Sequence, residues 1–285
     1  MHMTAAKEPH RETRRTARVP WRVLPDDGQR EPRVNLARDE ALARCADGSP
    51  TLRLWRSDRS VVLGRSQLAE AEVDARACRD LGVVVLRRFT GGGAVYHDPG
   101  NLNVTLVVDP EHPLVRARPG HGLLPRLYGA VLEPLVAAMR RIGVTAVAND
   151  RGIWIGKRKV SGAAAWLGPR AALVHATLLV DADLRALERV LAGPGAPDDP
   201  RWQRTRSRRA PVTSLALEGI LPPDAAAIET AIVTAFTGGR TAPGSLTTEE
   251  RTMADRLFVQ RYAHPAWHAT GETPRGGETE HPVGS

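Results

Sequence analysis

Residues 87–93 read Arg-Arg-Phe-Thr-Gly-Gly-Gly, a combination that can bind an anion. Glycine has no Cβ, so three in succession leave backbone N–H groups open to an approaching phosphate or carboxylate. Arg87 and Arg88 add planar guanidinium groups that match the same oxyanions. A lone glycine triplet is more often a plain hairpin turn beside surface arginines. The stretch therefore predicts an anion-binding loop only if a second feature supports it.

A second cationic stretch, residues 149–163, reads Asn-Asp-Arg-Gly-Ile-Trp-Ile-Gly-Lys-Arg-Lys-Val-Ser-Gly-Ala. It is not a phosphate-binding P-loop, because the interval from Gly152 to Lys157 is one residue short and Arg158 stands where that loop needs Ser or Thr. What remains is a group of cations beside a turn of small residues, which in isolation fits a solvated hairpin. Neither stretch decides the function alone.

Together the two stretches resemble the lipoate–protein ligase A family, within the wider group of biotin and lipoate protein ligases and octanoyltransferases. The resemblance covers about Val34 to Trp267. It is carried, in chain order, by Asn35-Leu36-Ala37 with Glu40, Leu54-Trp55-Arg56, Val61-Val62-Leu63-Gly64-Arg65-Ser66-Gln67, Arg87-Arg88-x-Thr90-Gly91-Gly92-Gly93-Ala94-Val95-x-His97-Asp98-x-Gly100-Asn101, Asn149-Asp150, Lys159-Val160-Ser161-Gly162-x-Ala164, His175-x-Thr177-Leu178-Leu179 and Arg206-Ser207-Arg208.

The resemblance implies an ATP-dependent ligase. In this family lipoate and ATP give lipoyl-adenylate and pyrophosphate, and the acyl group then passes to a lysine amine of an acceptor protein. The acceptors are lipoyl domains of 2-oxoacid dehydrogenase complexes and the glycine-cleavage H protein. The chain ends soon after Trp267, so we expect no C-terminal accessory domain. Three alternatives follow: a separate accessory-domain protein is a partner, the enzyme uses a preformed adenylate, or it is an acyltransferase.

The resemblance also assigns roles to residues. Lys159 matches the catalytic lysine that contacts the acyl carbonyl oxygen and the α-phosphate, and Asp150 matches a residue that holds Mg²⁺. The residues expected to bind ATP or lipoyl-AMP are Arg88, Gly91, Gly92, Gly93, Ala94, Val95, Tyr96, His97, Asn101, Asp150 and Lys159. The residues expected to bind lipoate are Arg65, Gly92, Lys159, Ser161, Gly162 and His175.

Three other readings stay open. An octanoyl- or lipoyl-transferase of the same fold uses a cysteine placed near or after the lysine stretch, whereas Cys45 and Cys78 both precede Gly91. Biotin ligation fits less well, because the Arg-x-Thr-Gly-Gly-Gly and Lys-Val-Ser-Gly motifs have the residues typical of the lipoate enzymes. A degenerate paralogue that only binds nucleotide or lipoate is disfavoured by the intact Lys159. One departure from the family is Ala176, where glycine is expected.

The elements that must position these residues follow from hydrophobic spacing. Apolar residues recur at helical intervals over Leu124–Ile142, and short apolar runs predict strands. Further helices are expected at Asn35–Arg44, Ala69–Leu81, Ala182–Leu191, Ala225–Phe236 and Thr248–Tyr262, and strands at Leu52–Trp55 paired with Val61–Leu63, at Val83–Leu86 buried on both faces, and at Asn103–Val108, Val144–Ala148, Ile153–Ile155 and Leu173–Val180. This order predicts an α+β fold with a mixed, largely antiparallel central sheet flanked by helices.

Composition limits the remaining classes. The 285 residues carry a net charge of +8, which favours an anionic partner, but aromatic residues make up only 4%, so nucleic acid is a weak candidate. The sequence contains no run of about 18 apolar residues, so no membrane-spanning helix is predicted. Two cysteines without a CxxC motif fit the reducing cytoplasm. We expect a disordered basic tail at 1–19, one catalytic domain at 20–268 and a disordered tail at 269–285.

Overall fold

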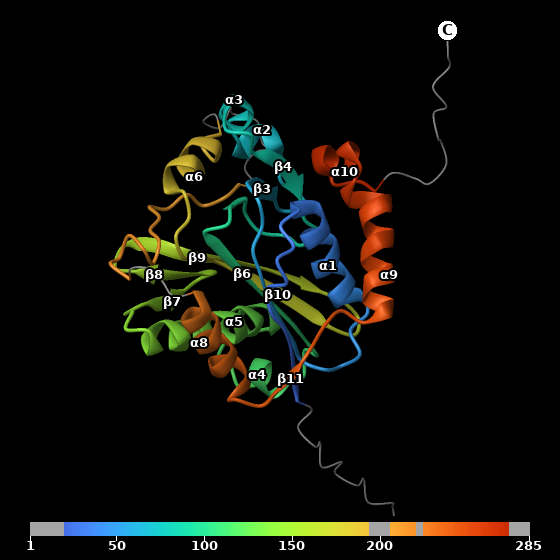
Figure 1. Ribbon diagram of the computed structural model, residues 1–285, viewed down its shortest axis with the longest axis vertical. Helices are drawn as coiled ribbons and strands as arrows, with labels where there is room; N and C mark the ends of the chain where they lie inside the picture. Colours follow the sequence, from blue (N-terminus) through green and yellow to red (C-terminus); the bar gives the residue numbers. More distant parts are fainter. Residues whose placement is uncertain (1–19, 194–205, 221–224, 274–285) are drawn as a thin grey trace, which may run out of the picture.

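The centre of the fold is an eight-stranded mixed sheet (Figure 1). The computed structural model describes residues 20–193, 206–220 and 225–273. In spatial order the large sheet contains β11 (Thr241–Pro243), β1 (Trp21–Leu24), β2 (Thr51–Trp55), β6 (Asn101–Val108), β10 (Ala172–Leu179), β9 (Arg158–Leu167), β8 (Gly152–Ile155) and β7 (Val147–Asn149). The pairs β11–β1 and β1–β2 are parallel and the other five pairs are antiparallel. The predicted mixed, largely antiparallel sheet is confirmed.

A second sheet of three strands carries the start and the end of the glycine loop. Its order is β4 (Val84–Arg87), β3 (Ser60–Leu63) and β5 (Val95–His97). The strand β3 is parallel to β4 and antiparallel to β5. Residues 88–94 connect the outer strands β4 and β5, so the arginine-glycine stretch crosses the end of the central strand β3.

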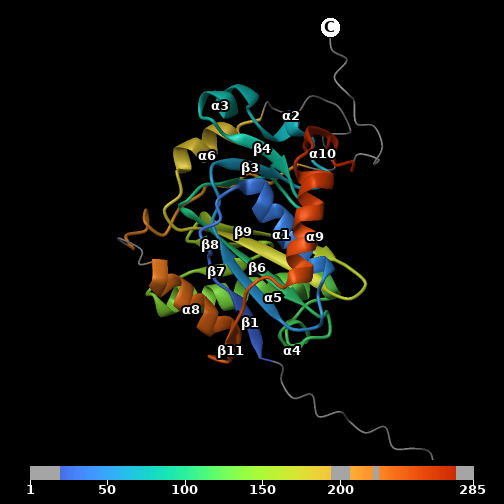
Figure 2. The same cartoon turned by 45° about the vertical axis from the view of Figure 1, so that its right-hand side comes forward.

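One face of the large sheet packs on the long helix α5 (Leu123–Arg141), with α8 (Ala225–Thr237) and the short α4 (Pro113–Arg116) beside it (Figure 2). The helix follows the predicted spacing: Leu127, Val131 and Leu135 are fully buried against Val104 and other strand residues. Gly143, with a positive φ of 83°, follows its end. This face is the main apolar core.

The opposite face of the large sheet, called the polar face below, is also buried and carries polar side chains beside apolar ones such as Val107 and Leu173. Arg53 on β2, Asn103 and Thr105 on β6 and His175 on β10 all lie on this side. It is covered by α1 (Pro32–Arg44) and by the three-stranded sheet. Outside these lie α2 (Ala69–Glu72), α3 (Ala75–Asp80), α6 (Leu184–Val190), α9 (Thr248–Leu257), the π-helical turn η1 (Phe258–Tyr262) and α10 (Pro265–Thr270).

Several local predictions were wrong for identifiable reasons. The strands β2 and β3 do not pair with each other, because they belong to different sheets. The predicted helix Ala69–Leu81 is two short helices, because Val73 is extended and the Asp74 carboxylate caps the second one. The strand β4 is an edge strand with Val84 exposed, not a strand buried on both faces. The ten-residue strand β9, which begins at Arg158 within the second cationic stretch, was not predicted from the sequence.

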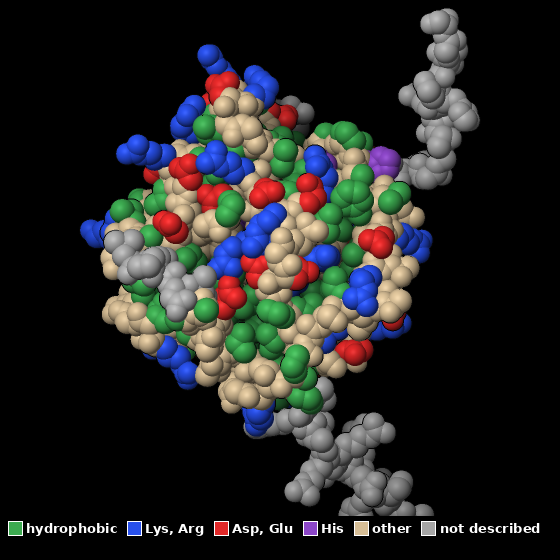
Figure 3. All heavy atoms as spheres, viewed as in Figure 1, with side chains coloured by type: hydrophobic (Ala, Val, Ile, Leu, Met, Phe, Trp, Pro, Cys, Tyr) green, Lys and Arg blue, Asp and Glu red, His purple; other side chains and the backbone are tan. Residues whose placement is uncertain are grey.

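The expected tails lie largely outside the described residues, namely 1–19 and 274–285. The helix α10 runs to Thr270, past the expected boundary at 268. Within the described part of the chain, no helix has both the length and the apolar composition that a membrane crossing requires. On the face shown in Figure 3, basic and acidic side chains are interspersed rather than gathered in one basic stripe.

Candidate active site

Two adjoining cavities, of about 230 and 340 Å³, lie between the polar face of the large sheet and the strand β5. Joined, they fall in the range of roughly 300–1,000 Å³ that is usual for small-molecule sites. Seven residues line both cavities and therefore mark their junction: Ala94, Val95, Lys159, Gly162, Thr177, Ser207 and Arg208.

The two cavities differ in their walls. The first is lined by Leu36, Trp55 and Val62 together with the buried polar groups His97, Asn103 and His175. The second is lined by Tyr96 and by residues of α6 and the segment after Arg206, namely Leu187, Glu188, Leu191, Arg208, Arg209 and Val212. Successive side chains of a strand point to opposite sides. The strand β5 thus turns Tyr96 to the second cavity and His97 to the first.

Arg88 holds the glycine loop in shape. Its buried guanidinium donates from Nη2 to the carbonyl oxygens of Gly91 (2.6 Å) and Gly93 (2.8 Å) and from Nη1 to that of Val62 (2.9 Å). Burial lowers the pKa of Arg88 to about 10, which still leaves it cationic at neutral pH. The prediction that Arg88 lies at the anion site is compatible with its place in the cavity wall, and the structure adds that it orders the loop.

Arg87, in contrast, is a structural residue, and the reading of both arginines as anion ligands was wrong for this one. Its guanidinium is fully buried and donates to the carbonyl oxygens of Gly64, Arg65 and Gln67. It also donates to the carbonyl oxygens of His268 and Ala269 in α10. Every one of these contacts is to backbone, so Arg87 ties β4 to the C-terminal helix.

A buried hydrogen-bond network supports the loop from below. The Asp39 carboxylate accepts from Arg53 (2.6 Å) and contacts Nδ1 of His175 (3.2 Å). Nε2 of His175 lies 2.9 Å from Oγ1 of Thr90, and that oxygen also accepts from Nε of Arg88 (2.8 Å). The burial of His175 lowers its pKa, and the contact with Asp39 opposes the shift. His175 therefore connects α1 to the glycine loop.

Lys159 lies at the junction of the cavities, near the start of β9. Its backbone pairs on one side with Trp154 of β8 and on the other with Pro211 and Thr213, to which it is joined by hydrogen bonds of 2.8 and 2.9 Å. The side chain crosses Gly152, where a Cβ would stand 2.5 Å from Lys159 Cε. Gly152 was not singled out from the sequence, since its role appears only when β8 and β9 are paired.

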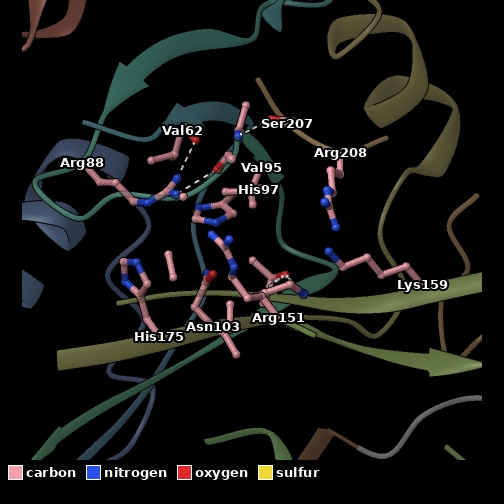
Figure 4. A pocket seen from close by; sticks show the side chains of 18 of the residues that line it. Val62, Arg88, Val95, His97, Asn103, Arg151, Lys159, His175, Ser207 and Arg208 are labelled. Atoms are coloured by element: carbon pink, nitrogen blue, oxygen red, sulfur yellow. Dashed lines mark hydrogen bonds between the residues drawn. The ribbon is translucent and has the colours of Figure 1, made fainter. Parts of the chain in front are cut away.

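Two further cations, Arg151 and Arg208, line the first cavity together with this lysine. In Figure 4 Arg208 points toward the Lys159 ammonium, and Arg151 lies close by. The exposed Asp150 carboxylate is the acidic group nearest to them, 4.0 Å from Arg151 and 3.9 Å from Arg208. Burial lowers the pKa of Lys159, and Asp150 offsets part of the shift. Like charges gathered in this way form a site for an anion.

Ser207 is a residue whose role the sequence did not reveal. Its hydroxyl accepts from the backbone N–H of Ala94 (2.8 Å) and from Nε2 of Gln67 (3.1 Å), and its N–H donates to Glu72. It thereby fixes the last residue of the glycine loop. The match of Arg206-Ser207-Arg208 to the family pointed to this segment, but it did not show which residues Ser207 contacts.

Most of the predicted site residues meet at the cavities. Those that line one or both are Arg88, Gly92, Gly93, Ala94, Val95, Tyr96, His97, Asp150, Lys159, Ser161, Gly162 and His175. Three do not: Gly91 lies outside both linings, Asn101 is buried in β6 against Asn103, and the Arg65 guanidinium lies over the Trp267 ring. His97, expected with the nucleotide, faces the first cavity.

Comparison with known proteins identifies the family of the chain. Residues 31–237 match the family model of the lipoyl protein ligase A/B catalytic domain, and the chain belongs to that family. It is 32% identical over 250 residues to lipoate-protein ligase A subunit 1 of Thermoplasma acidophilum, covering 83% of this chain and 91% of that protein. It is 30% identical over 278 residues to the octanoyltransferase LipM of Kyrpidia tusciae, covering 87% and 98%.

Solved structures show the same architecture. The structure of a bipartite lipoate protein ligase and its E2 lipoyl domain from Thermoplasma acidophilum superposes with a TM-score of 0.74, at 28% identity, over 91% of this chain and 100% of that one. A lipoate-protein ligase A bound with ATP superposes with a TM-score of 0.71, also at 28% identity, over 88% and 98%. The lipoate–protein ligase resemblance is confirmed at the level of the family.

The buried imidazole of His97 makes stability depend on pH. Its pKa is lowered to about 3, mainly by burial, from an ordinary value of 6.5. The unfolded chain therefore binds the extra proton first, and stability is lost as the pH falls from 6.5 toward 3. His97→Phe should reduce the slope of unfolding free energy against pH by about 1.4 kcal/mol per unit between about pH 4 and 6.

Urea unfolding at several pH values measures this slope. His121→Gln, at an exposed loop position outside both cavities, is the control measured in parallel. An unchanged slope in folded His97→Phe would show that His97 titrates normally.

Proposed function

We propose that this protein is an ATP-dependent lipoate–protein ligase, which forms lipoyl-AMP and transfers the lipoyl group to a lysine of an acceptor protein. The observation that carries the proposal is the place of Lys159, at the junction of the two cavities. In this assignment the acyl chain lies in the first cavity, against its apolar residues Leu36, Trp55 and Val62, and the adenylate occupies the second. The carboxyl group and the α-phosphate then meet beside the Lys159 ammonium.

The chemistry requires this arrangement of charge. A carboxylate and a triphosphate repel each other, and cations together with backbone N–H donors must offset that repulsion. A pair of unit charges 4 Å apart is worth about 1 kcal/mol in bulk water and about 4 kcal/mol at an effective dielectric near 20. The partial burial of Lys159 therefore strengthens its attraction to a reacting anion. Arg151 and Arg208 add to the same field.

Asp150 is the residue proposed to hold Mg²⁺. Among the described residues no group of three or more His, Cys, Asp or Glu side chains is arranged for a metal ion. Magnesium often takes one or two protein carboxylates and completes its shell with phosphate oxygens and water. The exposed Asp150 carboxylate at the cavity edge fits that pattern. The ion would neutralise phosphate charge.

The second step needs an acceptor at the cavity mouth. A lipoyl domain is the acceptor proposed here, and the related Thermoplasma acidophilum ligase was solved with its E2 lipoyl domain. The glycine-cleavage H protein is the other candidate. That relative is also bipartite, which supports the proposal of a separate accessory-domain protein. Since the described residues place no free buried base beside Lys159, positioning of the incoming amine supplies much of this step.

The direct test supplies lipoate, ATP and Mg²⁺ and measures pyrophosphate release and the mass of a lipoyl-domain acceptor. Synthetic lipoyl-AMP tests the transfer step separately, without an accessory protein. The proposal requires at least transfer from lipoyl-AMP. Failure of both steps, together with acyl transfer from an octanoyl carrier protein, would overturn it.

Replacement of Lys159 tests its assigned role. An ammonium that binds the reacting anions more tightly in the transition state lowers the barrier, so Lys159→Ala should slow pyrophosphate release by about 10²–10³-fold. Lys157 is an exposed lysine in the turn between β8 and β9 and lies outside both cavities, so Lys157→Ala is the matched control. Equal, mild effects of the two substitutions in folded protein would refute the assignment.

Gly152 should prove necessary because it leaves room for Lys159. A Cβ at this position would stand 2.5 Å from Lys159 Cε and 2.6 Å from the Ser161 carbonyl oxygen. Gly152→Ala should therefore lower kcat for pyrophosphate release at least tenfold. If the loss acts through the lysine, the double variant Gly152→Ala, Lys159→Ala is no slower than Lys159→Ala alone.

The control for this series is Gly129→Ala on α5, where a Cβ makes only ordinary contacts of 3.4 Å. Its activity should match that of the parent. A Gly152→Ala protein with the parental kcat would show that the lysine tolerates the added methyl group.

The octanoyltransferase reading is the second candidate, because LipM aligns over nearly its whole length. That chemistry needs a cysteine nucleophile, yet Cys45 caps the end of α1 and Cys78 is buried in α3, and neither lines the cavities. Burial also raises the pKa of both thiols, which disfavours the thiolate. A double Cys45→Ala, Cys78→Ala variant should retain most acyl transfer, and a trapped thioester in the parent would favour the transferase.

A further inference from the structure

The floor of the first cavity is a row of residues on neighbouring strands. The Thr177 hydroxyl on β10 accepts a hydrogen bond from the Gly162 N–H on β9. Asn103 on β6 pairs in register with Thr177 on one side and with Trp55 of β2 on the other. Adjacent strands lie about 4.8 Å apart, so Asn103 is about 10 Å across the sheet from Gly162. An acyl chain activated beside Gly162 and Lys159 therefore extends over Asn103.

At that depth the cavity contains hydrogen-bonding capacity that the protein does not use. Nδ2 of Asn101 donates to Oδ1 of Asn103, which leaves Oδ1 of Asn101 and Nδ2 of Asn103 buried without a partner among the described residues. Turning both amides by 180° reverses the bond but still leaves one atom of each unpaired. Asn103 is 2% exposed and lines the cavity.

His97 faces the same region from the strand β5. It is 4% exposed, its ring meets the edge of Trp55 at 5.6 Å, and it makes no hydrogen bond within the described residues. With a pKa of about 3 the ring is neutral at neutral pH, so it presents one N–H donor and one acceptor. In Figure 4 His97 and Asn103 lie on the far side of the cavity from Lys159.

These groups stand among apolar walls. Leu36 and Val62 complete the lining at this end, and the indole N–H of Trp55 is already donated to Thr105. A plain alkyl tail here leaves the Asn103 amide nitrogen without a hydrogen bond, and an unpaired buried polar group is costly. A tail with weak acceptor atoms, such as the two sulfurs of a dithiolane, avoids part of that cost.

We propose that Asn103 and His97 determine acyl specificity by selecting a sulfur-bearing tail, as in lipoate, over the plain alkyl tail of octanoate. The inference rests on the proposed function only for the direction of the chain in the cavity. It names the feature of the substrate that is recognised, and it places that recognition about 10 Å from the reacting carboxyl group.

Equilibrium binding of the free acids tests this without any catalytic step. Calorimetry with lipoate and octanoate, in the absence of ATP, should give a preference for lipoate of roughly tenfold in the parent protein. Asn103→Leu keeps a similar shape and removes the amide, so it should bring the ratio of the two dissociation constants close to one. The matched control is Asn149→Leu, at an exposed asparagine of β7 outside both cavities, which should keep the parental ratio.

His97→Phe provides a second variant and should also reduce the ratio, so a poorly folded Asn103→Leu protein does not end the test. Equal affinities for the two acids in the parent, or a parental ratio in folded Asn103→Leu and His97→Phe, would overturn the inference, as would binding of neither acid. Selective binding of lipoate without pyrophosphate release or transfer would instead refute the ligase activity and leave the specificity assignment standing.

Discussion

Burial of charged guanidinium groups beside the cavities is the constraint on which the site depends. Arg53 and Arg88 are each at most 4% exposed, and a buried charge is costly unless a counter-charge or several hydrogen-bond acceptors surround it. Arg53 is paired with Asp39. Among the described residues Arg88 donates only to carbonyl and hydroxyl oxygens, those of Val62, Thr90 and the glycine loop. The loop therefore takes its shape because its oxygens must satisfy Arg88. His175 links the two arginines, because it contacts Asp39, the partner of Arg53, and Thr90, which accepts from Arg88.

The sequence predicted the parts of the fold that local periodicity governs. The helix α5 has its apolar residues at helical spacing and was located to within about a residue at each end. The strand β9 was missed because its pairing partners, β8 and β10, leave both of its faces mixed: Lys159, Gly162 and a run of alanines carry no alternating pattern. Likewise the pairing of β2 with β6 rather than β3 depends on contacts about fifty residues apart, which no local pattern encodes.

The site was predictable as a list of residues but not as an arrangement. Matched motifs pointed to Arg88, Lys159 and most of the cavity lining, yet they gave Arg87 the same meaning as Arg88. The difference between the two arises from strand geometry: successive side chains of an extended segment point to opposite sides, so one enters the cavity wall and the other enters the protein. Ser207 and Gly152 acquire roles only through long-range contacts, with Ala94 and Lys159 respectively.

The opposite orientations of the Arg87 and Arg88 side chains also connect the helix α10 to the site. Arg87 is fixed by the carbonyl oxygens of His268 and Ala269, while the indole of Trp267 donates to the Arg87 carbonyl oxygen (2.9 Å). Arg88, the next residue, holds the glycine loop. A displacement of α10 would leave the buried Arg87 guanidinium with fewer hydrogen-bond acceptors, which costs free energy. A shift of Arg87 in response would also move the backbone of Arg88, the next residue. The helix therefore contributes to the geometry of a cavity that it does not line.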